Sequence, residues 1–372
     1  MATSSRPAEA LPPGGTIAVA MSGGVDSSVA AALCVAAGYR VFGIMLRLWA
    51  EDGAAGANKC CTAGAIDDAR AVAEHLGIPF SVLDAREAFK AQIVDGFLAA
   101  AQVGQTLNPC FACNRQIRFR WLLERAMALG ADALATGHYA RVVGGPKGPW
   151  RLLRGLDPSK DQSYMLHRLG QAQLARACFP VGEHPKSEVR AMAARFGLPV
   201  ADRPDSVDLC WTGDGGLPGF LERQLPAGAL QPGAILDLEG RQLGRHAGLA
   251  RYTIGQRRGI GVAAGTPLYV VARDAERNAL ILGEASALAG SRVPIVDLHW
   301  IAGRPPTGAL RVSAQIRYRA PAEPGELRFG AAGRAEMRFD RPVRAPASGQ
   351  GLVVYDGQTV LGGGRIDMEA VA

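Results

Sequence analysis

Apolar runs of strand length alternate with longer amphipathic stretches through the first half of the chain. Apolar residues fill Thr16–Met21, and a helical pattern rich in Ala, Val and Leu then runs from Ser27 to a closing glycine, Gly38. The alternation continues with strands expected at Tyr39–Trp49, Phe80–Leu83 and Ala131–Tyr139, the last of which runs into a glycine turn. Helices are expected at Ile66–Leu76, Arg86–Val103, Arg115–Leu129 and Ser187–Phe196. This alternation predicts a doubly wound parallel sheet, in which ligands bind at the carboxyl ends of the strands.

The pattern changes near Leu217. Beyond this residue Gly and Pro become frequent, the apolar runs are short, and no long helical pattern remains. Strands are expected there at Ala234–Leu238, Leu268–Ala272, Ala279–Leu282, Leu310–Tyr318 and Leu352–Tyr355, and a hairpin is expected earlier, at Arg141–Arg154. We therefore predict that the second part of the chain is all-β.

A glycine loop, Ser22-Gly23-Gly24-Val25-Asp26-Ser27, joins the first strand to the first helix. This layout turns backbone N–H groups and a helix N-terminus toward a phosphate, and glycine allows the close approach. The loop lacks the Gly-Lys-Ser/Thr of a Walker A loop and the G-x-G-x-x-G of dinucleotide sites. It resembles the pyrophosphate loop (PP-loop) of ATP pyrophosphatases, which transfer AMP to a substrate oxygen. Asp26 is expected either to cap the helix or to reach a phosphate-bound Mg²⁺.

Length and charge bound what the protein can be. A chain of 372 residues can form two or three domains with their own cores. Its net charge of +7 and pI of about 9.2 permit an anionic partner such as nucleic acid. Tyr252–Gly259 and Gln315–Arg319 combine arginine with tyrosine, which suits phosphate binding with base stacking, although a solvated strand face has the same composition.

The compartment affects how the cysteines are interpreted. No apolar run reaches the roughly 18 residues of a membrane span, and residues 1–14 lack the apolar segment of a signal peptide. We predict a cytoplasmic protein without membrane contact, with a loose tail over residues 1–14. Seven cysteines in such a chain indicate free thiols, a metal site or redox chemistry rather than a disulfide framework.

Cys110 and Cys113 have the C-x-x-C spacing of metal and redox sites. We expect Cys113 to lie at the start of a helix beside Arg115, which would lower its pKa and favour the thiolate. A purely structural thiol remains an alternative. Cys210 lies in a polar loop, and its spacing alone does not indicate a function. The pair Cys60-Cys61 is taken as structural.

Several motifs in a fixed order resemble the tRNA-uridine 2-sulfurtransferase family, also called tRNA-specific 2-thiouridylase (MnmA/TrmU). They are Ser22–Ser28, Asn108-Pro109 with Cys113-Asn114, Ala135–Tyr139, Lys160–Tyr164, Asp205-Ser206 with Cys210, Tyr252–Arg257 and Leu361–Gly364. The resemblance extends from about Thr16 to Ile366. It implies a PP-loop α/β domain over residues 15–216, a small central domain over 217–285 and a C-terminal β-barrel over 286–372.

The resemblance also implies an activity, the 2-thiolation of the wobble uridine (position 34) of tRNAs for Lys, Glu and Gln. The uracil O2 would attack the α-phosphate of ATP, with Mg²⁺ as the expected cation. The residues implied to bind ATP are Ala20, Met21, Ser22, Gly23, Gly24, Val25, Asp26, Ser27, Leu46 and Gly137.

In the same resemblance, Cys210 is similar to the cysteine that carries a persulfide and Cys113 to the nucleophile that liberates its sulfur. A Cys113–Cys210 disulfide would result, and a cysteine desulfurase or sulfur-relay protein would reload Cys210. Asn108, Pro109 and Cys110 correspond to the contact with the target base. The implied tRNA contacts are His138, Lys160, Asp161, Gln162, Arg317, Tyr318 and Gln350.

One departure from the family pattern keeps alternatives open. Many members have Asp where this chain has Cys110, so Cys110, Cys113 and Cys210 are also candidate ligands of a [4Fe–4S] cluster, as in some related tRNA thiolases, or of zinc. PP-loop ligases of the argininosuccinate, asparagine or GMP synthetase type are another class, but they would not need Cys113 and Cys210. A non-catalytic RNA-binding protein would not need an intact Ser22–Ser27 loop.

Overall fold

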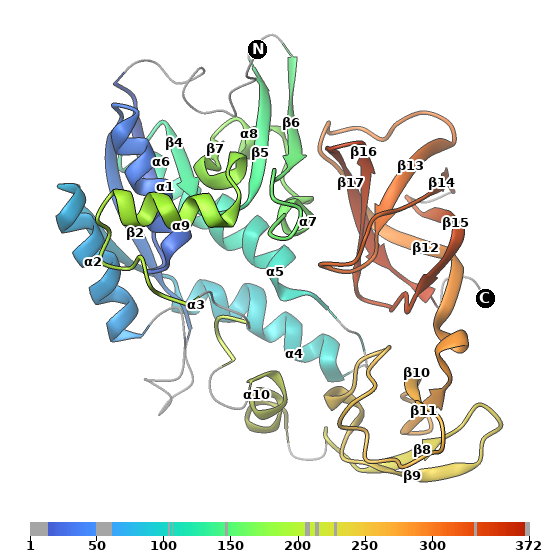
Figure 1. Ribbon diagram of the computed structural model, residues 1–372. Helices are drawn as coiled ribbons and strands as arrows, with labels where there is room; N and C mark the ends of the chain where they lie inside the picture. Colours follow the sequence, from blue (N-terminus) through green and yellow to red (C-terminus); the bar gives the residue numbers. More distant parts are fainter. Residues whose placement is uncertain are drawn as a thin grey trace.

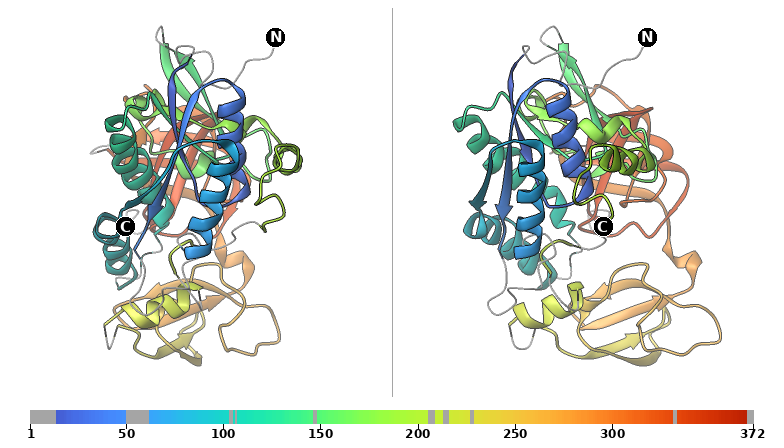
Figure 2. Two further views of the ribbon diagram at one scale, coloured as in Figure 1. Left: turned by 90° about the vertical axis from the view of Figure 1, so that its left-hand side faces the viewer. Right: turned by 60° about the vertical axis from the view of Figure 1, so that its left-hand side comes forward.

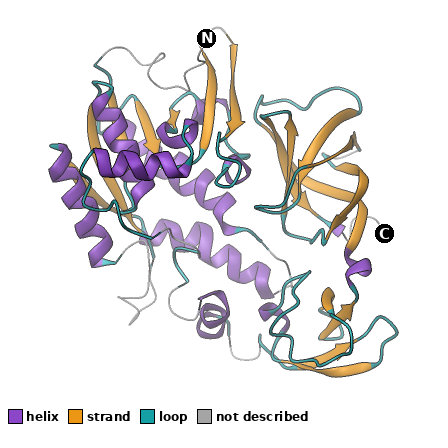
Figure 3. Ribbon diagram, in the orientation of Figure 1, coloured by secondary structure: helices purple, strands orange, loops and turns teal. Residues whose placement is uncertain are grey.

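The computed structural model describes residues 14–49, 62–102, 105, 107–145, 148–204, 209–212, 216–226, 229–330 and 333–368. An α/β domain, a small central β-sheet and a C-terminal barrel follow one another along the chain (Figure 1). Most of the helices gather in the α/β domain, whereas the barrel is built from strands (Figure 3). The predicted fold class is therefore confirmed. The tail before residue 14 and the pair Cys60-Cys61 lie outside the described residues.

The first domain is built on a five-stranded sheet in the order β3-β2-β1-β4-β7, with all four pairings parallel. Its strands are β1 (Thr16–Ala20), β2 (Arg40–Arg47), β3 (Phe80–Asp84), β4 (Ala133–Thr136) and β7 (Ala177–Cys178). The chain adds β2 and β3 on one side of β1, and β4 and β7 on the other. The strand order therefore reverses between β1 and β4, which is where such sheets form a ligand crevice.

Both faces of this sheet are covered because alternate side chains of β1 point in opposite directions. Ile17 and Val19 pack with helices α1 (Val25–Ala36), α2 (Ala63–Leu76) and α9 (Lys186–Arg195). Figure 2 shows α1 and α2 on the same side of the strands. Ala18 faces the other way, into a cluster with residues of η2 (Cys113–Leu122) and α6 (Leu123–Ala128).

Two long helices contain π-helical turns. The helix predicted at Arg86–Val103 forms as three consecutive segments, namely α3 (Arg86–Phe89), η1 (Lys90–Val94) and α4 (Asp95–Gln102). The next forms as α5 (Pro109–Ala112), η2 (Cys113–Leu122) and α6 (Leu123–Ala128). Helices with π-helical turns often occur at functional sites.

The second of these helices begins six residues earlier than its predicted start at Arg115. Asn108 Oδ1 accepts a hydrogen bond from the Cys110 N–H at 3.0 Å, and Pro109 occupies the first helical position. Asparagine at the cap and proline at the first position are a standard helix start. This signal is present in the sequence, although the helix is expected to begin only at Arg115. Cys113 therefore lies inside the helix and not at its N-terminus.

A hairpin links the α/β domain to the barrel. The predicted hairpin forms as β5 (Ala140–Gly145) and β6 (Gly148–Arg154), and β6 pairs with β17 (Thr359–Ile366). Three short helical segments, α7 (Ser163–Leu166), α8 (Gln171–Leu174) and η3 (Pro180–Glu183), follow the hairpin.

The central domain is not all-β. It contains helix α10 (Gly216–Gln224), whose Phe220 and Leu221 are buried. The Phe220 ring packs edge-on against Trp211, with ring centroids 4.7 Å apart. The helix is short and follows a glycine-rich segment, which explains why no helical period was visible. The sheet that follows has the order β10-β11-β8-β9 and consists of β8 (Gly233–Leu236), β9 (Gln242–His246), β10 (Tyr269–Asp274) and β11 (Ala279–Gly283).

The C-terminal strands close into a barrel because β12 pairs with both β15 and β17. The strands are β12 (Ala289–Trp300), β13 (Leu310–Gln315), β14 (Glu323–Phe329), β15 (Ala335–Arg344), β16 (Gly351–Asp356) and β17. Alternate residues of these strands, among them Val293, Leu327, Met337 and Leu352, form the barrel core. None of the helices in the described part of the chain combines the length and the apolar character that a membrane span requires.

Candidate active site

The glycine loop is held in shape by its own serines. The Ser27 hydroxyl accepts a hydrogen bond from the Ser22 N–H at 3.1 Å and donates one to the Gly24 carbonyl at 3.1 Å. Gly23 has φ +73°, and a Cβ on it would lie 2.5 Å from the carbonyl oxygen of Ala65. Only glycine fits such a position.

The other predicted ATP residues meet this loop at one edge of the sheet. Ala20 at the end of β1 pairs with Ile44 of β2 and with Thr136 of β4. The turn after β4 comes so close that a Cβ on Gly137 would lie 2.7 Å from the Asp26 carbonyl carbon and the Ser27 nitrogen. Leu46 lies at the end of β2. The fold thus gathers the predicted ATP-binding residues at the point where the strand order reverses.

Asp26 is paired with residues that the sequence analysis did not connect to it. Its Oδ1 accepts hydrogen bonds from the Tyr139 hydroxyl at 2.7 Å and from Lys186 Nζ at 2.6 Å. The helix-capping role considered for Asp26 is wrong, because Gly24 is the N-cap residue and makes no side-chain cap. Lys186 is buried at the start of α9, and its own N–H donates to Asp157 Oδ2 at 2.9 Å.

The three predicted thiols lie in one region. Cys113 is buried in a cluster with Ile117 and Trp211, and Cys210 packs against the same cluster. Trp211 fixes the position of its neighbour Cys210, since its ring packs edge-on against Phe97 at 5.5 Å between centroids. Leu48, just beyond the end of β2, belongs to the same cluster. The thiols therefore lie beside the edge of the sheet that carries the glycine loop.

The expected low pKa of Cys113 is contradicted. Burial raises its pKa to about 12, and the nearby guanidinium of Arg118 lowers it only in part. Burial likewise raises the pKa of Cys110 to about 11, and Cys210 adds to the shift. The prediction failed because Cys113 is inside the helix and enclosed by apolar side chains, which disfavour a charged thiolate. Arg118, rather than Arg115, is the guanidinium that acts on this thiol.

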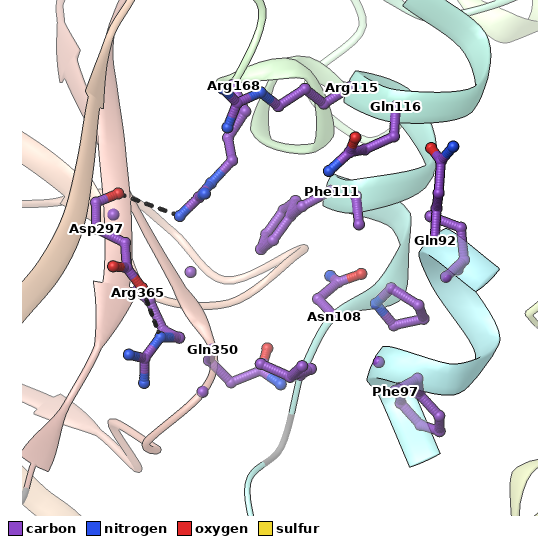
Figure 4. Close-up of a pocket in the computed structure, with 18 residues that line it drawn as sticks. Gln92, Phe97, Asn108, Phe111, Arg115, Gln116, Arg168, Asp297, Gln350 and Arg365 are labelled. Carbon is purple, nitrogen blue, oxygen red and sulfur yellow. Dashed lines mark hydrogen bonds and ion pairs between the residues drawn. The ribbon is translucent and has the colours of Figure 1, made fainter. Parts of the chain in front are cut away.

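Asn108, Pro109 and Gln350, three of the predicted contacts with the RNA, line one cavity of about 240 Å³ (Figure 4). The cavity lies between the helices of the α/β domain and the barrel. Phe111, another lining residue, packs on Tyr164 with ring centroids 5.2 Å apart, and Tyr164 stacks on Tyr318 at 6.2 Å. Aromatic side chains thus connect this cavity to Tyr318, which is also predicted to contact the RNA.

Three other predicted RNA contacts make hydrogen bonds within the protein, His138 and Gln162 at the turn around Gly137 and Asp161 within the segment 155–163. Asp161 Oδ1 accepts hydrogen bonds from the N–H groups of Gly155 and Ser163, both at 3.0 Å. Gln162 Oε1 accepts one from the Tyr139 N–H at 3.0 Å. His138 is buried, its Nδ1 lies 2.7 Å from Thr136 Oγ1, and burial lowers its pKa to about 3. Lys160, by contrast, is partly exposed.

Arg317 and Tyr318 do not lie on a strand face as the pattern suggested. Strand β13 ends at Gln315, and a turn follows in which the Ala320 N–H donates to the Arg317 carbonyl at 3.1 Å. Arg317 Nη2 donates to the carbonyls of Ile254 at 3.3 Å and Ala345 at 3.2 Å. It therefore joins the central domain to the barrel.

Comparison with known proteins agrees with this architecture. Residues 15–214 match the tRNA methyl transferase HUP domain, residues 219–284 the tRNA methyl transferase PRC-barrel domain, and residues 292–366 the aminomethyltransferase beta-barrel domain. A tRNA-specific 2-thiouridylase MnmA from Chloroflexus aurantiacus is 49% identical over 96% of this chain and 99% of that protein. The corresponding protein of Moorella thermoacetica is 47% identical over 95% and 99%.

The chain belongs to the tRNA-specific 2-thiouridylase (MnmA) family. Membership confirms the resemblance seen in the sequence and assigns the chain the activity of a tRNA sulfurtransferase, ATP-dependent 2-thiolation of tRNA. Solved structures are more distant. A 4-thiouridine synthetase–RNA complex with bound ATP is 16% identical over 58% of this chain and 47% of that chain, with a TM-score of 0.35, and so distant a likeness carries no argument.

The alternatives to a 2-thiouridylase are not favoured. Family membership decides against the nitrogen-adding PP-loop ligases and against a non-catalytic RNA-binding protein. Within the described ranges, no group of three or more His, Cys, Asp or Glu side chains is arranged to hold a metal ion.

Two residues that contact the candidate site, Lys186 and Arg118, are not among those expected from the sequence. In the sequence, Lys186 is only a lysine at the start of a helix, which by itself does not indicate a binding site. Arg118 was one of several arginines on a predicted helix. Arg118 Nη1 donates a hydrogen bond to Asn114 Oδ1 at 3.1 Å, and Asn114 Nδ2 donates one to the Met165 carbonyl at 3.2 Å. The Lys186 assignment depends on a contact between distant segments, whereas Arg118 acts on Cys113 within the same helix.

Proposed function

We propose that this protein thiolates C2 of uridine 34 in tRNAs for Lys, Glu and Gln, with ATP to activate the base and a persulfide on Cys210 as the sulfur source. The proposal rests on one observation, that the glycine loop and the thiol cluster lie next to each other. The glycine loop and the cluster that contains Cys113, Cys210 and Leu48 lie at the same edge of the parallel sheet. Adenylation and sulfur transfer need such an arrangement because both act on one carbonyl group.

In the first step the uracil O2 attacks the α-phosphate of ATP, an O–P bond forms, and diphosphate leaves. The loop N–H groups and the hydroxyls of Ser22 and Ser27 are suited to the phosphates. Mg²⁺, when bound with ATP, would offset the charge of the leaving diphosphate, and Asp26 is the carboxylate placed to hold it. Lys186 lies against Asp26 and would reach the same phosphates.

In the second step the Cys113 thiolate attacks Sγ of the Cys210 persulfide, which forms the Cys113–Cys210 disulfide and releases hydrosulfide. Hydrosulfide adds to C2 of the activated base, and the C2–O bond breaks to release AMP. A thiol reductant must then restore both cysteines. Because burial keeps Cys113 protonated in this conformation, its proton must be removed when the substrates bind.

Two further expectations belong to the same proposal. Cys210 needs a sulfur-donor protein, either a cysteine desulfurase or a sulfur-relay protein, because the reaction consumes one persulfide per turnover. The cytoplasm is the expected location, since the tRNA substrate and ATP are found there.

The test is formation of 2-thiouridine in an unmodified tRNA transcript by aerobically purified, iron-free protein given ATP and a persulfide donor. We expect Cys113→Ser and Cys210→Ser each to abolish the product, and Cys110→Asp to retain substantial activity. Cys34→Ala, which changes a buried thiol in α1, is the matched control and should remain active.

Mass spectrometry of digested tRNA measures the product and locates the modified nucleotide. If activity appears only after anaerobic iron–sulfur reconstitution, the persulfide route is wrong. Sulfur at a nucleotide other than 34 would contradict the proposed position.

A further inference from the structure

The cavity that contains Asn108 and Gln350 has an unusual charge. Three arginines line it, Arg115 from η2, Arg168 from the segment after α7 and Arg365 from β17 (Figure 4). Asp297 of β12 is the only carboxylate among its lining residues. The three guanidinium groups and one carboxylate leave two uncompensated positive charges around a space of about 240 Å³.

The single carboxylate is already engaged. Asp297 Oδ2 accepts a hydrogen bond from Arg365 Nε at 2.9 Å, whereas Arg168 Nη2 reaches only the Asp297 backbone carbonyl, at 3.2 Å. Among the residues that the structure describes, no carboxylate forms an ion pair with Arg115 or Arg168. These two side chains therefore lack a paired carboxylate, although Asp297 acts on Arg168 from a distance.

The clustering has an electrostatic cost. Burial lowers the pKa of Arg168, Arg115 and Arg365 lower it further, and Asp297 offsets part of the shift. The pKa of His299 is also lowered, first by burial and then by Arg115 and Arg168. Cations brought together without counterions destabilise a fold, and an anion bound between them relieves the repulsion.

The remaining lining residues indicate the kind of anion. Gln92, Gln116 and Gln350 contribute side-chain amides, and Phe97 and Phe111 contribute apolar surface. Guanidinium groups suit phosphate oxygens, amides suit ribose hydroxyls and base edges, and aromatic rings suit a base or sugar face. This combination fits a segment of RNA backbone better than an isolated inorganic anion.

We propose that Arg115 and Arg168, assisted by Arg365, form a phosphate clamp that binds a backbone phosphate of the tRNA anticodon loop next to the target nucleotide. The proposal rests on the proposed tRNA substrate, because Asn108, Pro109 and Gln350 of the same cavity are the expected contacts with the target base and the tRNA. Arg168 belongs to the α/β domain and Arg365 to the barrel, so a phosphate held by both would fix the RNA across the two domains.

Binding of an anticodon stem-loop RNA over a range of salt concentrations tests the clamp. Arg168→Gln and Arg115→Gln should each weaken binding about 10-fold and make the slope of log K against log salt shallower by about 0.7–1. Arg292→Gln is the matched control, because it removes the same charge from an exposed arginine of β12 that pairs with Glu336 outside the cavity. It should change affinity by less than about twofold.

A methylphosphonate scan of the loop identifies the phosphate. Neutralising one particular phosphate should weaken binding to the wild type about 10-fold and have no further effect on Arg168→Gln, since the two changes remove the same contact. Arg168→Lys should restore part of the affinity. The clamp is wrong if Arg168→Gln and Arg292→Gln have the same RNA affinity and salt slope. It is also wrong if every neutralised phosphate weakens binding equally in the wild type and in Arg168→Gln.

A purely structural role has a different signature. Arg168 also links the two domains through the Asp297 carbonyl. A lower melting temperature with an unchanged salt slope would show that this link is its only role and would overturn the clamp. If the wild type forms no 2-thiouridine, the proposed function itself fails. If the wild type thiolates tRNA and Arg168→Gln binds RNA normally, only the clamp fails.

Discussion

At the residue scale, the carboxylate of Asp26 is the point where three distant segments meet. It lies in the first turn of α1, receives the Tyr139 hydroxyl from the turn after β4, and receives Lys186 from the start of α9. The Asp26 side chain is still about one-third exposed, so a ligand can approach it while the pair is intact. Lys186 therefore holds Asp26 in place and brings a positive charge to the edge of the sheet that carries the glycine loop.

Replacing Lys186 should impair adenylation. Lys186→Met removes the cation 2.6 Å from Asp26, and we expect tRNA-dependent diphosphate release to fall at least about 10-fold, because charge stabilisation of a leaving group is typically worth that much or more. Asp26→Ala should abolish diphosphate release. Stem-loop RNA binding should remain within about twofold in both variants.

The control is Lys90→Met, an exposed lysine that pairs with Asp95 and not with Asp26, and it should release diphosphate normally. Normal turnover of Lys186→Met would show that the ion pair is only structural.

The buried thiols pose a different question at this scale. A neutral Cys113 is a poor nucleophile, and its raised pKa keeps it neutral near pH 7 until the surroundings change. Arg118 is the group that can favour the thiolate, since it already lowers this pKa in part. If Cys210 carries the proposed persulfide, a neutral Cys113 would limit its discharge when no tRNA is bound.

At the element scale, short turns determine how closely the strand ends approach the first helix. The turn after β4 packs directly against the first residues of α1, and only a hydrogen atom at the Gly137 α-carbon leaves room for this contact. Gln162 supports the same turn through the Tyr139 N–H. The ATP site thus depends on a contact between two backbones.

Adding one methyl group at this turn should damage the ATP site. In Gly137→Ala the new Cβ would lie 2.7 Å from backbone atoms of Asp26 and Ser27, which cannot move without shifting α1. Overpacking of this kind costs roughly 1–3 kcal/mol. We expect ATP affinity to fall about 10-fold or more, measured by isothermal titration calorimetry, while the protein stays folded by circular dichroism.

Gly170→Ala is the comparison, because nothing lies within 4 Å of the Cβ position at Gly170. Unchanged ATP affinity in Gly137→Ala would mean that the turn does not border the nucleotide.

At the scale of the whole molecule, the three domains are joined by a few polar side chains and one shared sheet. Strand β6 of the α/β domain pairs with β17 of the barrel, and Arg317 reaches carbonyls of the central domain and of the barrel. An RNA that contacts several domains requires these junctions to hold their relative positions. Net charge of +7 would then favour RNA binding over the whole surface.

Removing the Arg317 junction should weaken RNA binding and leave the nucleotide site intact. Arg317→Gln loses the charge and the two carbonyl contacts, so we expect the Kd for tRNA to rise about 10-fold, since both positioning and phosphate attraction are affected. ATP affinity should not change. Arg311→Gln, an exposed barrel arginine paired with Asp340, is the matched control in filter binding. Loss of ATP affinity in Arg317→Gln with normal tRNA binding would contradict this view.

The sequence by itself determined the local parts of the site and most of the fold. Ser22–Ser27 was identifiable because a phosphate loop needs glycines and hydroxyls at adjacent positions between a strand and a helix. The order of strands and helices predicted the parallel sheet, and the change near Leu217 marked the start of the strand-rich part of the chain. These features depend on neighbouring residues, so they can be recognised from a linear pattern.

Only the tertiary structure decided which distant side chains act together. Lys186 contacts Asp26 across 160 positions, and Arg168 meets the Asp297 carbonyl across 129. The pKa of Cys113 was predicted in the wrong direction because burial, not position along a helix, controls it. Long-range packing determines burial and the meeting of charges, and no local sequence pattern records it.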